Sequence, residues 1–219
     1  MVLDTKICGL KTTEALDAAV KGGASHVGFI FFPKSPRHVT PQEAAKLRAH
    51  SGGKAKAVAV TVDADDMVLD AIVKTMQPDM LQLHGTESPE RVAEVKRRYR
   101  LPVMKAFAIH DQADLARIAP YRGIADRFLF DAKAPAGSRL PGGNGVRFDW
   151  NLLAGLDAGI DYMLSGGLNA ANIGDALRLV KPSAIDISSG VESAPGVKDT
   201  RLIEEFFKVV DATRNERAA

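Results

Sequence analysis

The chain has 219 residues, of which 46% are hydrophobic and 26% are charged, and its formal net charge at pH 7 is +2. Such a chain can bury a sizeable core, and the small net charge gives no electrostatic footprint for nucleic acid or an acidic membrane surface. The single cysteine, Cys8, cannot form an internal disulfide, and residues 1–8 lack the pattern of a secretory signal. The apolar runs are too short to span a bilayer, so we expect a cytoplasmic protein.

Short apolar runs alternate along the chain with longer segments of helical periodicity. The predicted strands are residues 5–8, 26–32, 56–62, 79–84, 102–108, 127–132, 161–166 and 184–189. The predicted helices are residues 12–23, 40–50, 64–76, 88–99, 111–119, a short one near 149–155, 169–180 and 199–213. The sequence TPQE, residues 40–43, forms a capping box at the start of the second helix, and Ser88 with Pro89 starts the fourth in a similar way.

The predicted strands are dominated by apolar residues, which is typical of a parallel sheet covered by helices. Eight strand–helix repeats in 219 residues fit a closed (β/α)8 barrel, or TIM barrel, better than an open sheet. An open doubly wound sheet usually carries a glycine fingerprint after its first strand, and residues 6–13 contain no GxGxxG. We therefore predict an α/β fold with one domain over residues 1–219.

Polar residues stand at the ends of several predicted strands, which is where barrel enzymes place their functional groups. Side-chain alternation puts Asp131 on the inner face of its strand, opposite Phe128 and Phe130, which would pack under helices. The residues at these strand ends are Cys8, His84, Asp131, Ser165 and Ser188. The same alternation places Lys6 with Cys8, Gln82 with His84, and Asp186 with Ser188.

Cys8 and Asp131 are the strongest candidates for chemistry. A carboxylate at the barrel mouth is costly to desolvate, which favours a function for Asp131 over a helix cap or a structural salt bridge. A lone cysteine such as Cys8 is commonly a buried hydrophobic residue. Its position at a strand end that faces Asp131 favours a reactive thiol instead. The ammonium group of Lys6 would lower the thiol pKa towards neutrality.

Two glycine-containing turns follow the last two predicted strands. Gly166 and Gly167 belong to the first turn, and Ser188, Ser189 and Gly190 belong to the second. In barrels these two loops often bind phosphate through backbone N–H groups, and glycine lets the backbone approach the anion closely. We therefore predict a phosphate site between the two turns.

Three features stay open at this stage. Arg37 lies in a proline-bounded loop, where it could clamp a carboxylate or simply be solvated. His84 could bind a ligand or be a satisfied core histidine, and the glycine-rich segment 133–145 could be a lid or a surface insert. The histidines are scattered and the cysteine is single, so the sequence predicts no metal site.

The motifs taken together resemble the phosphoribosylanthranilate isomerase family, in order and over nearly the whole chain. The matching motifs are KICGL (6–10), GFIFFPKSPRHV (28–39), QLHG (82–85), LFDAKAP (129–135) with GGNG (142–145) and FDW (148–150), LSGGL (164–168) with Asn172, and DISSGVE (186–192) with PGVKD (195–199).

This resemblance implies a barrel that catalyses the Amadori rearrangement of N-(5-phosphoribosyl)anthranilate in tryptophan biosynthesis, with no cofactor. It implies that Asp131 is the general acid, Cys8 the general base and Arg37 the ligand of the anthranilate carboxylate. The two glycine turns would hold the phosphate, and we add His84 and Asp186 to the substrate-binding residues. The expected partner is the small-molecule phosphoribosyl substrate, and the protein would be a monomer or a homodimer.

Three other kinds of barrel protein are alternatives to this family. The related isomerase of histidine biosynthesis uses an aspartate after its first strand and has two phosphate sites, and Cys8 argues against it. Indole-3-glycerol-phosphate synthase needs catalytic lysines and glutamates at strand ends, a pattern that this chain does not show. A catalytically silent barrel that only binds a sugar phosphate should have lost Cys8 or Asp131.

Overall fold

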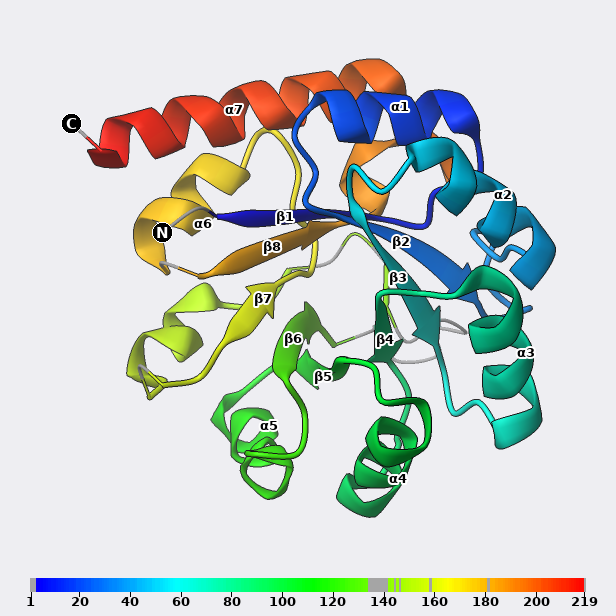
Figure 1. Ribbon diagram of the computed structural model, residues 1–219. Helices are drawn as coiled ribbons and strands as arrows, with labels where there is room; N and C mark the ends of the chain where they lie inside the picture. The colour runs from blue at the N-terminus through cyan, green and yellow to red at the C-terminus, as the bar shows by residue number, and fades with distance from the viewer. Residues whose placement is uncertain are drawn as a thin grey trace.

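Eight parallel strands close into a barrel that is surrounded by helices (Figure 1). The computed structural model describes residues 3–133, 142, 143, 145, 147–157, 159–180 and 182–218. Each strand pairs with the next along the chain, and β1 also pairs with β8, which closes the barrel. The strands are β1 (Asp4–Cys8), β2 (His26–Phe31), β3 (Lys56–Thr61), β4 (Met80–Leu83), β5 (Val103–Ile109), β6 (Arg127–Ala132), β7 (Tyr162–Leu164) and β8 (Ala184–Ile187). The predicted (β/α)8 fold is confirmed.

The helices follow the predicted order with a few local differences. They are α1 (Thr13–Lys21), α2 (Pro41–Ser51), α3 (Asp66–Met76), α4 (Pro89–Tyr99), α5 (Gln112–Ala116), α6 (Ile173–Leu179) and α7 (Thr200–Ala218), with the 3-10 turns η1 (Ala119–Tyr121), η2 (Trp150–Gly155) and η3 (Ser189–Val191). The predicted helix 111–119 stops early because Pro120 has no N–H to donate to the carbonyl of Ala116. The segment near 149–155 is a 3-10 turn rather than an α-helix.

An antiparallel hairpin that the sequence pattern did not predict follows the eighth strand. It consists of β9 (Glu192–Ala194) and β10 (Val197–Lys198), and it lies between η3 and α7. Its strands are too short to stand out from loop in a periodicity analysis. The hairpin carries two charged residues, Glu192 and Lys198, whose side chains are buried.

Both predicted helix caps are present. The Thr40 side chain accepts from the Glu43 N–H, and Glu43 Oε2 accepts from the Thr40 N–H at 2.7 Å, which completes the capping box. Ser88 Oγ accepts from the Arg91 N–H at 3.3 Å, with Pro89 in the first turn. These local bonds set where the loops after β2 and β4 give way to helix.

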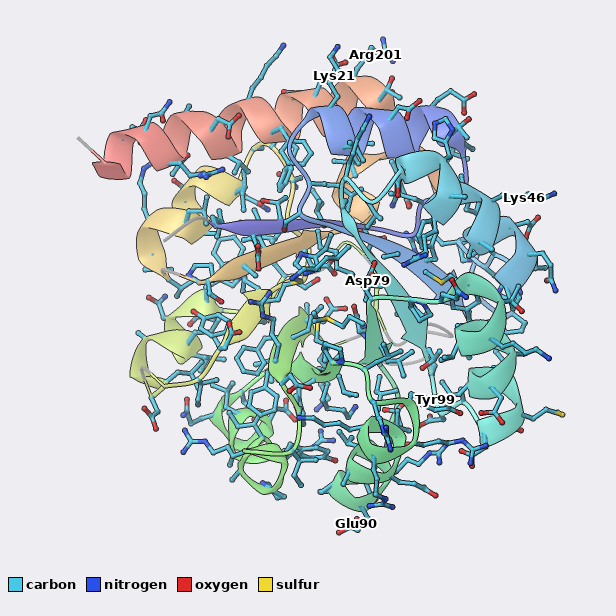
Figure 2. The ribbon with its side chains drawn as sticks, viewed as in Figure 1. Lys21, Lys46, Asp79, Glu90, Tyr99 and Arg201 are labelled. Carbon is cyan, nitrogen blue, oxygen red and sulfur yellow. The ribbon has the colours of Figure 1, made fainter. Side chains whose placement is uncertain are left out.

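Alternation along the strands separates two apolar layers. Leu129 packs inside the barrel with Cys8, whereas Phe128 and Phe130 belong to the core between the strands and the helices. Several charged side chains of the outer helices point to solvent, as Figure 2 shows for Lys21, Lys46, Glu90 and Arg201. In Figure 1, α1 and α7 lie side by side along one flank, where they are in contact. No helix in the described part of the chain is long and apolar enough to cross a membrane.

We predict that His26 destabilises the fold in acid. His26, at the start of β2, is 2% exposed, and burial lowers its pKa from 6.5 to about 4. Between these values the unfolded chain binds a proton that the folded chain does not, so stability falls as the pH drops from 6.5 to 4. The loss approaches about 3 kcal/mol for a shift of this size. Denaturant unfolding of the wild type and His26→Gln at several pH values checks this, and an equally steep loss in both would contradict it.

Candidate active site

A cavity opens at the carboxyl ends of the barrel strands. It brings together residues that are up to 181 positions apart in the sequence, from Cys8 to Ser189. The predicted site residues that line it are Cys8, Arg37, His84, Asp131, Gly166, Gly167, Asp186, Ser188 and Ser189. Gly190 is the one predicted site residue that does not line it, because it packs against the carbonyl of Leu168.

The Cys8 thiol lies at the end of β1 in a tightly packed environment. A Cβ placed on Gly28 would lie 2.9 Å from Cys8 Sγ and 3.0 Å from Lys6 Cε, so the glycine leaves the space that both side chains use. Cys8 is 5% exposed, and burial raises the pKa of its thiol, although the ammonium of Lys6 acts in the opposite direction. Lys6 therefore lowers the thiol pKa as predicted, but burial outweighs this effect, so the pKa is raised rather than brought towards neutrality.

A buried ion pair explains why Lys6 has this limited effect. Lys6 is fully buried, and its Nζ donates to Asp186 Oδ1 at 2.8 Å. Burial works to lower the pKa of Lys6, but the charge of Asp186 and the neighbouring Cys8 outweigh it and raise the pKa. Asp186 partly cancels the field of the ammonium at the thiol. Since Ser165 Oγ donates to Asp186 Oδ2 at 3.3 Å, both carboxylate oxygens already have partners.

His84 connects Asp131 to a buried amide. The Gln82 Nε2 atom lies 2.9 Å from His84 Nδ1, and His84 Nε2 lies 3.4 Å from Asp131 Oδ2. The two ring nitrogens of His84 thus contact the Gln82 amide on one side and the Asp131 carboxyl group on the other. The Gln82 Oε1 atom has no hydrogen-bond partner among the described residues. The sequence placed Gln82 on the same strand face as His84 but did not identify it as part of the site.

The glycine-rich segment 133–145, for which a lid or a surface insert was predicted, lies mostly outside the described residues. Of the residues that are described, Gly142 lies over Asp131 and His84, and a Cβ there would collide with Asp131 Oδ2. Gly143 lies over Arg37, where a Cβ would be 2.7 Å from Nη1. A side chain at either position would therefore displace the Asp131 carboxyl group or the Arg37 guanidinium.

Arg37 is buried in the wall of the cavity. Only 4% of it is exposed, so the alternative of a solvated surface arginine is wrong. Its Nε and Nη2 atoms donate to Glu192 Oε1 and Oε2, both at 2.8 Å, and Nη2 also donates to the Gly143 carbonyl at 3.3 Å. The guanidinium thus has a defined orientation before any ligand binds.

Glu192 and Lys198 are site-associated residues that the sequence reasoning missed. They belong to the hairpin β9–β10, and the motifs DISSGVE and PGVKD already contain them. Burial works to raise the pKa of Glu192, but Arg37 and Lys198 outweigh it and lower the pKa, so the group is a carboxylate. Burial lowers the pKa of Lys198, whose Nζ donates to Glu192 Oε1 at 2.6 Å.

The two glycine turns lie next to each other at the mouth. Gly166 and Gly167 have φ of 87° and 64°, a left-handed backbone that glycine adopts without strain. Within the described residues, the N–H groups of Gly166, Gly167 and Leu168 donate to no protein acceptor. The Asn172 side chain holds this turn by donating to the Gly167 carbonyl at 2.9 Å. Such backbone donors suit an anion.

The donor set of the described residues does not favour a metal. No group of three or more His, Cys, Asp or Glu side chains in that part of the chain is arranged to hold a metal ion. The cavity instead offers a thiol, a carboxyl group beside an imidazole, a guanidinium and unpaired backbone N–H groups. This set can move protons and bind two anionic groups of one ligand.

Comparisons with known proteins point to one family. A model of the family described as N-(5'phosphoribosyl)anthranilate (PRA) isomerase matches residues 5–209. The N-(5'-phosphoribosyl)anthranilate isomerase of Mesorhizobium japonicum is 73% identical over 219 residues, which is 100% of both chains.

Solved structures that are similar to this chain carry the same family name. The phosphoribosyl anthranilate isomerase of Thermotoga maritima superposes with a TM-score of 0.84 at 34% identity, covering 96% of this chain and 100% of that one. A phosphoribosyl anthranilate isomerase in complex with reduced 1-(o-carboxyphenylamino)-1-deoxyribulose 5-phosphate gives a TM-score of 0.82 at 32% identity over the same shares.

Proposed function

The chain belongs to the N-(5'-phosphoribosyl)anthranilate isomerase family, and we propose that Cys8 and Asp131 perform its reaction as base and acid. The family makes the protein an isomerase of tryptophan biosynthesis that converts N-(5-phosphoribosyl)anthranilate into 1-(2-carboxyphenylamino)-1-deoxyribulose 5-phosphate. The observation that supports the residue roles is that Cys8, Asp131, Arg37 and residues of both glycine turns line one cavity.

Asp131 begins the reaction as a general acid. Its proton goes to the ring oxygen of the furanose, the bond between that oxygen and C1′ breaks, and the anthranilate nitrogen lone pair forms a C1′=N iminium. The Asp131 Oδ1 atom accepts from the Ala132 N–H at 2.9 Å, while Oδ2 lies beside His84. A carboxyl group held in this way can donate from Oδ2 without rotating out of the cavity.

Cys8 completes the reaction as a general base. The iminium acidifies the hydrogen on C2′, and the thiolate takes that proton while the electron pair forms a C1′=C2′ double bond. The resulting enol then loses its O–H proton and gains one at C1′, which yields the ketone. Protons and electrons balance within the substrate and the two side chains, so we propose no cofactor.

The ends of the substrate are bound on separate loops. The phosphate would bind to the N–H groups of the turns at Gly166–Gly167 and Ser188–Gly190, and the anthranilate carboxylate to Arg37. His84 and Asp186 remain candidates for contact with the substrate between these ends. We place the reaction in the cytoplasm, in a monomer or a homodimer.

A fluorescence assay tests this function directly. The purified protein is mixed with fluorescent N-(5-phosphoribosyl)anthranilate, and the decay of fluorescence reports turnover. A silent barrel that only binds the sugar phosphate would leave the signal unchanged. The related substrate of histidine biosynthesis serves as the comparison, and faster turnover of that compound would overturn the assignment.

We predict that Arg37→Ala lowers kcat/KM by about 10–150-fold, because removing one charge-assisted contact costs about 1.5–3 kcal/mol. The affinity for inorganic phosphate should not change, since its turns make no bond to Arg37 among the described residues. Steady-state kinetics with calorimetric titration of phosphate measure both effects. An unchanged kcat/KM would remove Arg37 from the binding site.

The raised pKa of Cys8 predicts how the rate varies with pH. Because burial raises that pKa, the thiolate fraction, and with it the rate of thiol alkylation, should increase as the pH rises above 7. Lys6→Met removes the ammonium that opposes burial, so the rising limb should move to higher pH. The remaining charges near the thiol, Asp186 and Lys198, stay in place.

The pH dependence of iodoacetamide alkylation measures the thiolate directly. Lys46→Met, which removes an exposed lysine of α2, is the matched control. Identical alkylation profiles for the wild type and Lys6→Met would show that Lys6 does not act on the thiol.

A further inference from the structure

Glu192 occupies one whole edge of the Arg37 guanidinium. Its two oxygens accept from Nε and Nη2, and the two side chains are each 4% exposed. Glu192 does not line the cavity, whereas Arg37 and Gly143 do. Among the described residues, Nη1 is the guanidinium nitrogen that has no hydrogen-bond acceptor, and it lies on the side of Gly143, where a Cβ would be 2.7 Å from it.

Lys198 extends this contact to the phosphate turn. Its Nζ donates to Glu192 Oε1 at 2.6 Å and to the Ser188 carbonyl at 2.9 Å. Ser188 Oγ in turn donates to the Cys8 carbonyl at 3.1 Å. A continuous chain of partly buried polar contacts therefore runs from Arg37 through the hairpin to the phosphate turn and the end of β1.

We propose that Glu192 is a positioning residue that presents only the Nη1 side of Arg37 to the substrate carboxylate, and that Lys198 ties this arrangement to the phosphate turn. The inference rests on the proposed function, because it assumes that Arg37 binds the carboxylate. It also changes the expected contact: the Nε–Nη2 fork is occupied by Glu192, so the carboxylate must bind at Nη1. The hairpin would thereby set the separation of the two anion sites and select ligands that carry both groups.

Equilibrium binding of two ligands separates this role from general structural support. The first ligand is reduced 1-(o-carboxyphenylamino)-1-deoxyribulose 5-phosphate, and the second is the same compound with a phenyl ring that lacks the carboxylate. In Glu192→Gln an amide NH₂ replaces one acceptor, so the fork with Arg37 is broken. This variant should bind the carboxylate ligand about tenfold more weakly, because one charge-assisted contact is misplaced. It should bind the second ligand with the same affinity as the wild type.

The effect should pass through Arg37 alone. In an Arg37→Ala background, Glu192→Gln should cause no further loss of affinity for the carboxylate ligand. In kinetics, KM should rise more than kcat falls. Glu94→Gln, which breaks the exposed pair with Arg91, is the matched control and should bind both ligands like the wild type.

Two further variants cover the remaining cases. If Glu192→Gln does not fold, Glu192→Gln/Lys198→Met removes one charge of each sign and should lose the same selectivity for the carboxylate. Lys198→Met alone should keep that selectivity but weaken the binding of inorganic phosphate, because the Ser188 carbonyl loses its hydrogen bond from Lys198 Nζ. Unchanged phosphate affinity in this variant would overturn the part assigned to Lys198.

The results distinguish a failure of the role proposed for Arg37 from a failure of the role proposed for Glu192. If the wild type does not prefer the carboxylate ligand, or Arg37→Ala keeps the preference, the proposed role of Arg37 fails and the role of Glu192 with it. If Arg37→Ala abolishes the preference but Glu192→Gln keeps it, only the positioning role is overturned. Equal weakening of both ligands in Glu192→Gln would show a merely structural role.

Discussion

Asp131→Asn is expected to lower kcat by about 10²–10⁴-fold, the usual contribution of a positioned general acid. The amide is close in size to the carboxyl group and can still accept from the Ala132 N–H, but it has no acidic proton for the ring oxygen. The affinity for a product analogue should persist, because the phosphate turns and Arg37 lie on other loops.

Single-turnover kinetics beside circular dichroism measure this effect in a folded variant. Asp70→Asn, at an exposed carboxylate of α3 that pairs with Arg98, is the control and should keep wild-type kcat. A folded Asp131→Asn enzyme with kcat near that of the wild type would show that another group protonates the ring oxygen. His84 would then be the first residue to examine, because its Nε2 lies 3.4 Å from Asp131.

Cys8→Ser is expected to lower kcat by a similar factor, about 10²–10⁴-fold. Serine keeps the shape of the side chain, which matters beside Gly28, but a hydroxyl scarcely ionises near neutral pH. The reaction then lacks a base for the C2′ proton, while the opening of the ring by Asp131 can still occur. Rapid-quench experiments should therefore find substrate-derived imine rather than product.

Thiol alkylation provides an independent measurement of the same role. Because Cys8 is the only cysteine, loss of activity on alkylation reports on this residue alone. A bound product analogue should slow the loss, since Cys8 lines the cavity. If folded Cys8→Ser turns over within a few-fold of the wild type, the thiol only packs in the core and the base is elsewhere.

The architecture could be predicted from the sequence because it depends on local and repeating features. Apolar runs separated by amphipathic segments define eight strand–helix units, and the Thr40 and Ser88 caps act over three residues. Once those units form a barrel, the carboxyl ends of all strands meet at one face. That rule was enough to bring Cys8, Asp131 and Ser188 to one cavity.

The environment of each side chain depended on contacts between distant segments. Glu192 lies 155 positions from Arg37, and the two meet only because β8 pairs with β1 and brings the hairpin to the barrel mouth. No periodicity in the sequence identifies such a partner, although the motif that contains Glu192 was recognised. The same closure of the barrel buries Arg37.

The sequence by itself therefore determined the fold class, the face that carries the site and the types of functional group there, because periodicity and strand ends are encoded locally. Only the tertiary structure decided the charge balance at Cys8. The thiol pKa depends on how completely the barrel removes water and on the pairing of Lys6 with Asp186, 180 positions away. Desolvation and Coulomb interactions act through space, and a linear sequence does not specify those distances.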